Sequence, residues 1–191
     1  MTPRRSAADA ERTRFRIIDR ATTVASAEGF DSMTLGRVAG DVGMSKAGVI
    51  AHFGTMESLQ LAAVEQAVAV FRREVWDPVA EWTPGRERLE AICDTWLDYV
   101  VGSRYVGGCF TAAELSASPR VRAAAAAALV TWRRVLCEEV RQAGGGGAAD
   151  PETVVFELSS LVLGATQAMR LDLDDQAVDR ARRSMRRALA P

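Results

Sequence analysis

Helical periodicity runs through almost the whole chain of 191 residues. Apolar residues recur three and four positions apart, as on one face of an α-helix, and no segment alternates with the two-residue period of a strand. The chain contains 33 alanines, and alanine has the highest intrinsic helix propensity. Capping residues precede the stripes and glycines follow them. The sequence therefore predicts an all-α protein of about nine helices, one of them a short helix over about residues 109–117.

Two short helices are predicted after a longer one near the N-terminus. An apolar stripe predicts the long helix over residues 9–28. Thr34 and Ser45 are suitable N-cap residues for the next two helices, and Gly43 lies in the tight turn between them. This is the helix-turn-helix pattern, in which the second short helix enters the major groove of DNA.

The pattern divides the chain at residue 54. Residues 1–54 are predicted to form a three-helix helix-turn-helix domain, and residues 55–191 a helical bundle for ligand binding and dimerisation. A helix over residues 55–77 is expected to connect them. The first part holds eight basic and six acidic side chains, and the second sixteen and nineteen. This uneven distribution is compatible with a polyanionic partner, although the formal net charge is −1.

Composition and motifs exclude several classes of function. The single histidine, His52, rules out a two-histidine metal site, and the chain has neither a phosphate-binding loop nor a dinucleotide-binding glycine motif. No apolar run approaches the length of a membrane span, and no secretory signal is recognised. Three widely spaced cysteines predict reduced thiols. We therefore expect a cytoplasmic protein without a metal or cofactor.

A continuous set of motifs occupies residues 12–65. These motifs are Ile17-Ile18, Glu28-Gly29-Phe30, Met33-Thr34-Leu35, Val38-Ala39, Val42-Gly43-Met44-Ser45-Lys46, Gly48-Val49-Ile50-Ala51-His52-Phe53 and Glu57-Ser58-Leu59. Together they closely resemble the N-terminal DNA-binding domain of the TetR/AcrR family of bacterial transcriptional regulators. The later part of the chain is similar mainly in its number of helices.

The predicted DNA-binding residues lie at the starts of the two short helices, with one histidine further along: Thr34, Arg37, Ser45, Lys46, Ala47, Gly48 and His52. Small or polar residues at the start of a recognition helix let its backbone approach the bases. The resemblance implies that Lys46, Ala47 and Gly48 face bases, and that Thr34, Arg37 and His52 contact phosphates. The alternatives are a core histidine at 52 and an ordinary solvated lysine at 46.

Two positions depart from the family pattern. Ile50 and Met56 stand where family members commonly have tyrosine and lysine, both of which contact phosphates. The arginines among residues 4–20 are candidates to replace these contacts, because phosphate contacts depend mainly on charge. They also fit a flexible charged tail.

Both tyrosines and all four tryptophans follow residue 75. Pockets for small ligands are lined by aromatic and apolar side chains with a few polar groups. The resemblance implies such a pocket among the middle helices, lined by Trp96, Tyr99, Phe110 and Trp132. Glu114 or Gln167 would serve as its polar anchor. The alternative is that these aromatic residues form an ordinary core.

The helix predicted over residues 151–171 is apolar on two faces. One face can pack on its own core, so the other needs a partner. That second face carries Phe156, Ser160, Leu163 and Gly164. We expect a homodimer in which this helix and the last one pack against their mates.

These features predict a ligand-responsive DNA-binding transcriptional regulator rather than an enzyme. The simplest form is a homodimeric repressor that binds a palindromic operator and is released by a small-molecule effector. One alternative is an architectural DNA-binding protein without an effector, whose C-terminal core would be filled. The other is an enzyme that uses Cys93 or Cys109, for which His52 is the only histidine available as a base.

Overall fold

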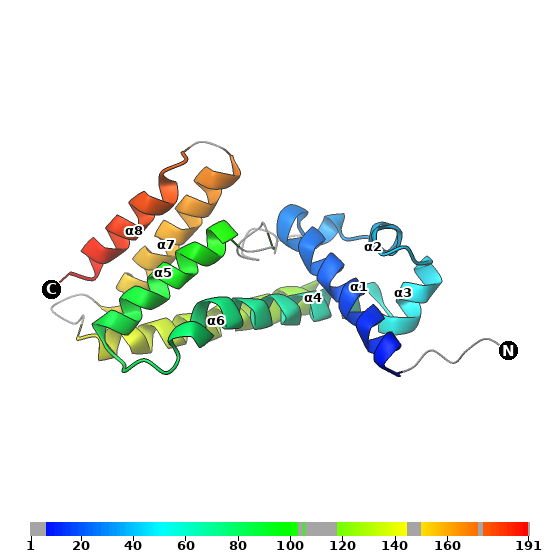
Figure 1. Cartoon of the computed structure of the whole chain (residues 1–191), viewed down its shortest axis with the longest axis horizontal. Coiled ribbons are helices and arrows are strands. Elements are labelled where there is room, and N and C mark those ends of the chain that lie inside the picture. Colours follow the sequence, from blue (N-terminus) through cyan, green and yellow to red (C-terminus); the bar gives the residue numbers. More distant parts are fainter. Residues whose placement is uncertain (1–6, 103–104, 106–117, 145–149, 172–173, 191) are drawn as a thin grey trace. The chain divides into compact units, whose positions relative to one another are not determined.

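The computed structural model describes residues 7–102, 105, 118–144, 150–171 and 174–190, and its regular elements there are all helical (Figure 1). The α-helices are α1 (Ala7–Glu28), α2 (Leu35–Asp41), α3 (Lys46–Phe53), α4 (Met56–Phe71), α5 (Arg86–Gly102), α6 (Pro119–Gln142), α7 (Pro151–Arg170) and α8 (Ala177–Ala188). Short turns of 3-10 or π type are η1 (Phe30–Ser32), η2 (Arg72–Trp76) and η3 (Asp77–Val79). The predicted all-α fold is confirmed. A short helix expected near residues 109–117 lies outside the described residues.

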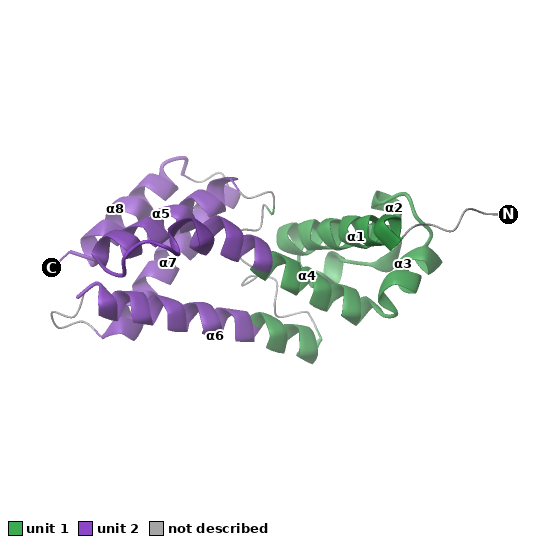
Figure 2. Cartoon of the chain, turned by 60° about the horizontal axis from the view of Figure 1, so that its bottom comes forward, with its two compact units in different colours: residues 1–68, 105–125 green, residues 69–104, 126–191 purple. Residues whose placement is uncertain are grey.

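The chain divides into two compact units (Figure 2). Unit 1 comprises residues 1–68 and 105–125, and unit 2 comprises residues 69–104 and 126–191. This division differs from the one predicted at residue 54. The difference arises because Leu59 of α4 and Val121 of α6 are fully buried in the core of unit 1. Helices α4 and α6 therefore each begin in unit 1 and end in unit 2.

One apolar cluster holds unit 1 together, and each of its helices contributes to it. Its most buried members include Ile17, Ala21, Val24, Phe30, Val38, Val49, Leu59, Ala63 and Val121. Burial of one large apolar side chain contributes about 1.5–3 kcal/mol. Helices α2 and α3 have only seven and eight residues, too few to be stable alone in water. Their shape therefore depends on this cluster.

The two predicted N-caps of the helix-turn-helix are confirmed. The Thr34 hydroxyl accepts a hydrogen bond from the Arg37 amide at 3.2 Å. The Ser45 hydroxyl accepts one from the Gly48 amide at 3.0 Å. Each bond satisfies an amide that has no partner within its own helix.

The turn between α2 and α3 is built on Gly43, whose φ is 70°. The Gly43 amide donates to the Gly40 carbonyl at 3.1 Å, and the Met44 amide to the Ala39 carbonyl at 2.9 Å. These two bonds form a Schellman motif, which requires a left-handed residue at the position of Gly43. Glycine adopts that conformation without a steric penalty.

In unit 2, helices α5, α7 and α8 pack side by side (Figure 1). The largest side chains in this core include Leu89, Ile92, Leu97, Leu136, Leu158 and Met185. Leu136 comes from α6, so all four helices contribute to the core of unit 2.

A buried ion pair joins α5 to α6 inside unit 2. Arg88 donates two hydrogen bonds to the Glu139 carboxylate, at 2.8 and 2.6 Å, and both side chains are less than a tenth exposed. Arg88 also donates to the Trp82 carbonyl at 2.9 Å, and its guanidinium lies 5.6 Å from the centre of the Trp76 ring. The buried charges are therefore both paired and hydrogen-bonded, as burial requires.

We predict that Glu139→Ala lowers the free energy of unfolding by about 3–5 kcal/mol, because it leaves Arg88 buried without a counter-charge. Urea denaturation followed by circular dichroism measures the change. The double variant Arg88→Met/Glu139→Leu replaces the pair with apolar side chains and should lose much less. A single variant as stable as the double variant would contradict this assignment.

Candidate nucleic-acid interface

One side of α3 is exposed, and it carries the predicted base-facing residues. Ser45, Lys46 and Ala47 are exposed, whereas Val49 and Phe53 are buried in the core of unit 1. The exposed side chains at the start of α3 are thus small, apart from one lysine. A recognition helix contacts base edges through its N-terminal residues, and small side chains permit that approach.

The Lys46 side chain extends across the first turn of α2. A Cβ atom at Gly36 would lie 3.0 Å from Lys46 Cε and 3.4 Å from Nζ, so the end of this lysine side chain packs closely against the Gly36 backbone. The first turn of α2, with Thr34 and Arg37, therefore adjoins the first turn of α3. In the described part of unit 1, Lys46 has no hydrogen-bond or ion-pair partner.

Two arginines of α1 support the ends of the short helices. Arg14 donates to the His52 carbonyl at 3.1 Å, and its guanidinium lies 4.3 Å from the centre of the Phe53 ring. Arg16 donates to the Val42 carbonyl at 3.2 Å. Carbonyls at a helix C-terminus lack partners within the helix and attract cations. These arginines therefore hold α2 and α3 against α1.

Two further arginines form ion pairs within unit 1. Arg20 donates to Asp41 at 2.7 Å, and Arg37 donates two bonds to Glu28 at 2.6 and 2.5 Å. The hydrogen bonds from Arg37 lower the pKa of Glu28, and the same bonds raise the pKa of Arg37. Both partners are consequently charged at neutral pH. These carboxylate partners were not predicted from the sequence.

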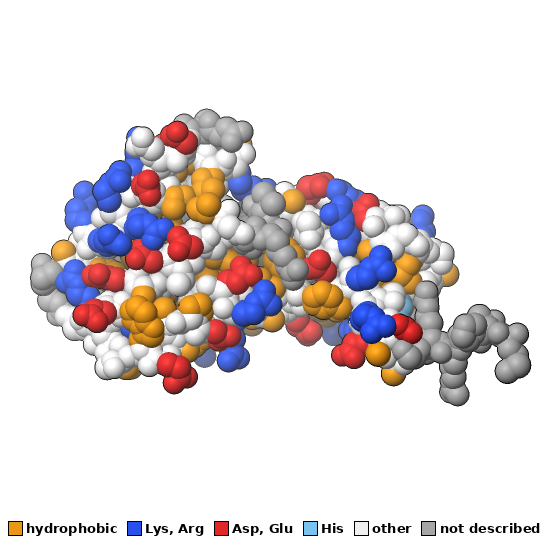
Figure 3. Space-filling view, in the orientation of Figure 1, with side chains coloured by type: hydrophobic (Ala, Val, Ile, Leu, Met, Phe, Trp, Pro, Cys, Tyr) orange, Lys and Arg blue, Asp and Glu red, His pale blue; other side chains and the backbone are white. Residues whose placement is uncertain are grey.

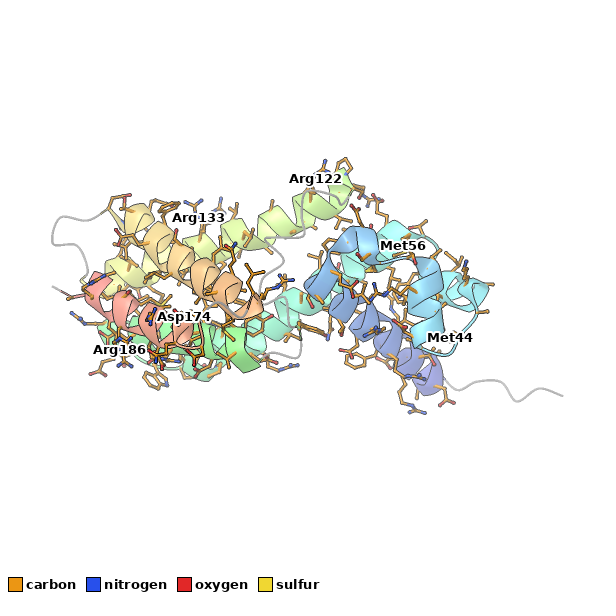
Figure 4. All side chains as sticks on the ribbon, turned by 90° about the horizontal axis from the view of Figure 1, so that it is seen from above. Met44, Met56, Arg122, Arg133, Asp174 and Arg186 are labelled. Atoms are coloured by element: carbon orange, nitrogen blue, oxygen red, sulfur yellow. The ribbon has the colours of Figure 1, made fainter. Side chains whose placement is uncertain are left out.

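The two positions that depart from the family pattern differ in their surroundings. Met56, labelled in Figure 4, is partly buried and packs against the core of unit 1. Ile50 is partly exposed on α3. His52 is also partly exposed, and its ring lies 6.4 Å from that of Phe53. Methionine at 56 therefore contributes to packing at the start of α4.

Unit 2 brings together three of the predicted pocket residues and Phe71, which was not predicted to belong to a pocket. The ring of Phe71 meets those of Trp96, Tyr99 and Trp132 edge to face, with centroids 6.2, 5.3 and 5.0 Å away. Trp96 and Trp132 also meet at 5.5 Å. We call these four residues the aromatic cluster. Phe71 lies within the helix predicted over residues 55–77, but the sequence did not indicate its ring neighbours.

The aromatic cluster contains an unsatisfied hydrogen-bond donor. Trp132 Nε1 is buried and has no hydrogen-bond partner in the described residues. Of the other predicted pocket residues, Gln167 is exposed on α7, so the structure does not place it in the cluster. Phe110 and Glu114 lie outside the described residues.

A separate cavity of about 670 Å³ opens in unit 2 beside α8. None of the predicted pocket residues lines it. Arg182, at its wall, pairs with Asp94 at 2.5 Å and with Asp98 at 2.7 Å. Figure 3 shows acidic and basic side chains close together over this part of unit 2. The polar residues of the wall are Asp98, Asp174, Asp175, Asp179 and Arg182.

The outer face of α7 carries exposed apolar side chains at helical spacing. Phe156 is 70% exposed and Leu163 is 53% exposed. Ser160 is exposed between them and Gly164 is exposed directly after Leu163. The Ser160 hydroxyl donates to the Phe156 carbonyl at 2.8 Å. Nothing lies within 4 Å of a Cβ built at Gly164. Large apolar side chains exposed together commonly mark an interaction surface.

The buried cysteines are poor nucleophiles. Burial raises the pKa of the Cys93 thiol to about 12, and burial is also the main cause of a raised pKa at Cys137. Cys109 lies outside the described residues. Within the described ranges, no group of three histidine, cysteine, aspartate or glutamate residues is arranged to hold a metal ion. No helix there has the length and apolar character needed to cross a membrane.

Two family profiles match the chain. The family described as bacterial regulatory proteins, tetR family, matches residues 17–63. The family described as tetracyclin repressor-like, C-terminal domain, matches residues 85–185. No curated protein sequence matches the chain.

Solved structures share this fold. A TetR transcriptional regulator from Chloroflexus aurantiacus J-10-FL has a TM-score of 0.82 and 20% identity, with 93% of this chain and 94% of that one covered. AibR in complex with isovaleryl coenzyme A and operator DNA has a TM-score of 0.77 and 20% identity, with coverages of 91% and 95%. FadR from Bacillus subtilis in complex with stearoyl-CoA has a TM-score of 0.74 and 13% identity, with coverages of 92% and 97%.

The C-terminal match alone spans more than half of the chain, and the N-terminal match covers the helix-turn-helix. The protein therefore belongs to the TetR family of bacterial regulatory proteins.

Proposed function

We propose that the protein is a transcriptional repressor that binds a palindromic operator as a homodimer and leaves it when a small-molecule effector binds. The observation that carries this proposal is the exposed start of α3. Ser45, Lys46 and Ala47 face solvent there, shortly after the turn at Gly43. Lys46 is chemically suited to donate to guanine or to a phosphate. A DNA partner also implies that the protein acts in the cytoplasm.

Selection of binding sites from fragmented genomic DNA tests the proposal. We expect the wild-type protein to enrich a palindrome, and Lys46→Ala/His52→Ala to bind it at least tenfold more weakly, because each lost contact costs about 1–3 kcal/mol. Arg134→Ala is the matched control, since it removes one exposed positive charge from unit 2. Equal recovery of a palindrome by the wild type and the double variant would contradict the assigned recognition helix.

We propose that the effector binds at the aromatic cluster and hydrogen-bonds to Trp132. Support comes from the buried, unsatisfied Nε1 atom, since an unmade buried hydrogen bond costs about 1–3 kcal/mol and a ligand acceptor would remove that cost. Related regulators have been crystallised with isovaleryl coenzyme A and stearoyl-CoA. Helices α4 and α6 both run from one unit into the other, so a population shift started at Trp132 has covalent routes to unit 1.

We predict that Trp132→Phe weakens effector binding about tenfold, because phenylalanine keeps a ring but lacks the N–H donor. Binding is measured by titration followed by tryptophan fluorescence. The first compounds tested are isovaleryl coenzyme A and stearoyl-CoA, and the next are metabolites related to the gene beside the selected operator. Trp82→Phe is the control, because Trp82 is half exposed and lies outside the cluster. If a compound that dissociates the protein from its operator binds Trp132→Phe as tightly as the wild type, Trp132 is not its hydrogen-bond donor.

We propose that the dimer forms through the exposed face of α7, which carries Phe156, Ser160, Leu163 and Gly164, together with α8. Leu163→Glu should raise the dissociation constant of the dimer at least thirtyfold, because a charge buried at the centre of an interface costs about 2 kcal/mol or more. Sedimentation velocity measures the change. Val101→Glu is a matched control at a similarly exposed aliphatic residue of α5. If both variants dimerise equally, the interface does not include Leu163.

An architectural DNA-binding protein without an effector is the second candidate. The edge-to-face packing of the aromatic cluster favours it, because these rings already fill space with one another. The two candidates differ in one measurement. An operator affinity that no compound changes, including the metabolites of the neighbouring gene, would favour the architectural role.

A further inference from the structure

We infer that Glu28 is a specificity-determining residue of the DNA interface: its carboxylate occupies Arg37 in place of a DNA phosphate and keeps this arginine from binding duplexes of arbitrary sequence. The inference rests on the proposed DNA-binding function. In this proposal, Glu28 controls how readily Arg37 binds a DNA phosphate.

The contact between the two residues has the geometry of phosphate recognition. Arg37 Nη1 and Nη2 donate to the two carboxylate oxygens of Glu28 at 2.6 and 2.5 Å. A guanidinium binds two oxygens of a phosphate through the same pair of parallel bonds. Glu28 and a phosphate therefore compete for the same edge of Arg37, and only one of them can hold it at a time.

Arg37 lies where a DNA backbone is expected. In a helix-turn-helix, the first helix crosses the phosphate backbone while the start of the second contacts bases. Arg37 is in the first turn of α2, directly after Gly36, and the Lys46 side chain crosses that turn. The Arg37 side chain is 35% exposed and that of Glu28 is 46% exposed, so an approaching phosphate can reach the pair.

Glu28 is held in place behind Arg37. It is the last residue of α1, and the Ser32 hydroxyl of η1 donates to its carbonyl at 3.1 Å. Phe30, two residues later, is buried in the core of unit 1. The backbone at Glu28 is thus fixed on both sides, and its carboxylate remains near Arg37 even when the pair opens.

The pair is weak enough to open and strong enough to discriminate. An exposed ion pair contributes little to stability, so a well-placed phosphate can displace Glu28. The displaced carboxylate then lies close to that phosphate, and like charges repel. A loosely docked, non-specific duplex gains little from this exchange, whereas an operator held by base contacts at α3 can drive it.

The experiment measures binding to a duplex of arbitrary sequence by fluorescence anisotropy, between about 50 and 200 mM salt. We expect Glu28→Gln to steepen the slope of log K against log salt by about 0.9 for each Arg37 that gains a phosphate. Relative to the wild type, the affinity of the variant then increases about 3.5-fold more for one Arg37, and about twelvefold more for the two of a dimer, when salt is lowered over this range. The glutamine keeps the size of the side chain and removes its charge.

Two controls separate this effect from a general change in charge. Glu65→Gln removes the same charge from an exposed residue of α4 that has no partner in the described residues, and its slope should match that of the wild type. Glu28→Gln in an Arg37→Ala background should also leave the slope unchanged from Arg37→Ala alone. Circular dichroism melts verify that each variant is folded.

The outcomes distinguish the two proposals. A wild-type protein that binds no duplex at any salt would overturn both the DNA-binding function and the role of Glu28. Wild-type binding with equal slopes for Glu28→Gln and Glu65→Gln would overturn the role of Glu28 alone. A steeper slope that persists without Arg37 would also overturn it, because the gained contact would then belong to another cation.

Discussion

Two helices of seven and eight residues cannot keep their shape alone, so the proposed DNA-facing edge depends on the core that buries them. That core includes Leu59 from α4 and Val121 from α6, which lie beyond the helix-turn-helix itself. Val38 and Val49 fix one side of each short helix, and we propose that the opposite sides face DNA. The recognition surface is therefore a consequence of burial elsewhere in unit 1.

Four arginines among the described residues of unit 1 make contacts within the protein. Arg14 and Arg16 support helix ends, whereas Arg20 and Arg37 face carboxylates. In our proposal, the two ion pairs limit non-specific attraction to DNA, because a paired arginine releases fewer counter-ions. The buried pair of unit 2 differs in kind, since its partners are held from all sides and cannot exchange for a solvent ligand.

The sequence was sufficient where the determining contacts are local. Thr34 and Ser45 cap amides three residues away, and Gly43 lies within the motif that it closes, so periodicity and capping rules predicted this region correctly. The ion pairs were missed because they join residues nine and twenty-one positions apart, and depend on how α1 meets α2. The position of Phe71 among its ring neighbours likewise depends on packing between helices, which no single stripe encodes.

The ring of Trp132 contributes to packing, but packing makes no use of its N–H group. Phenylalanine also packs edge to face against aromatic rings and carries no N–H group. The Nε1 donor gains a hydrogen bond only in a state where an acceptor reaches it, and the described residues supply none. In our proposal the effector-bound state supplies it. Since Trp132 lies on α6, which also buries Val121 in unit 1, the side chain that gains this hydrogen bond belongs to a helix shared by both units.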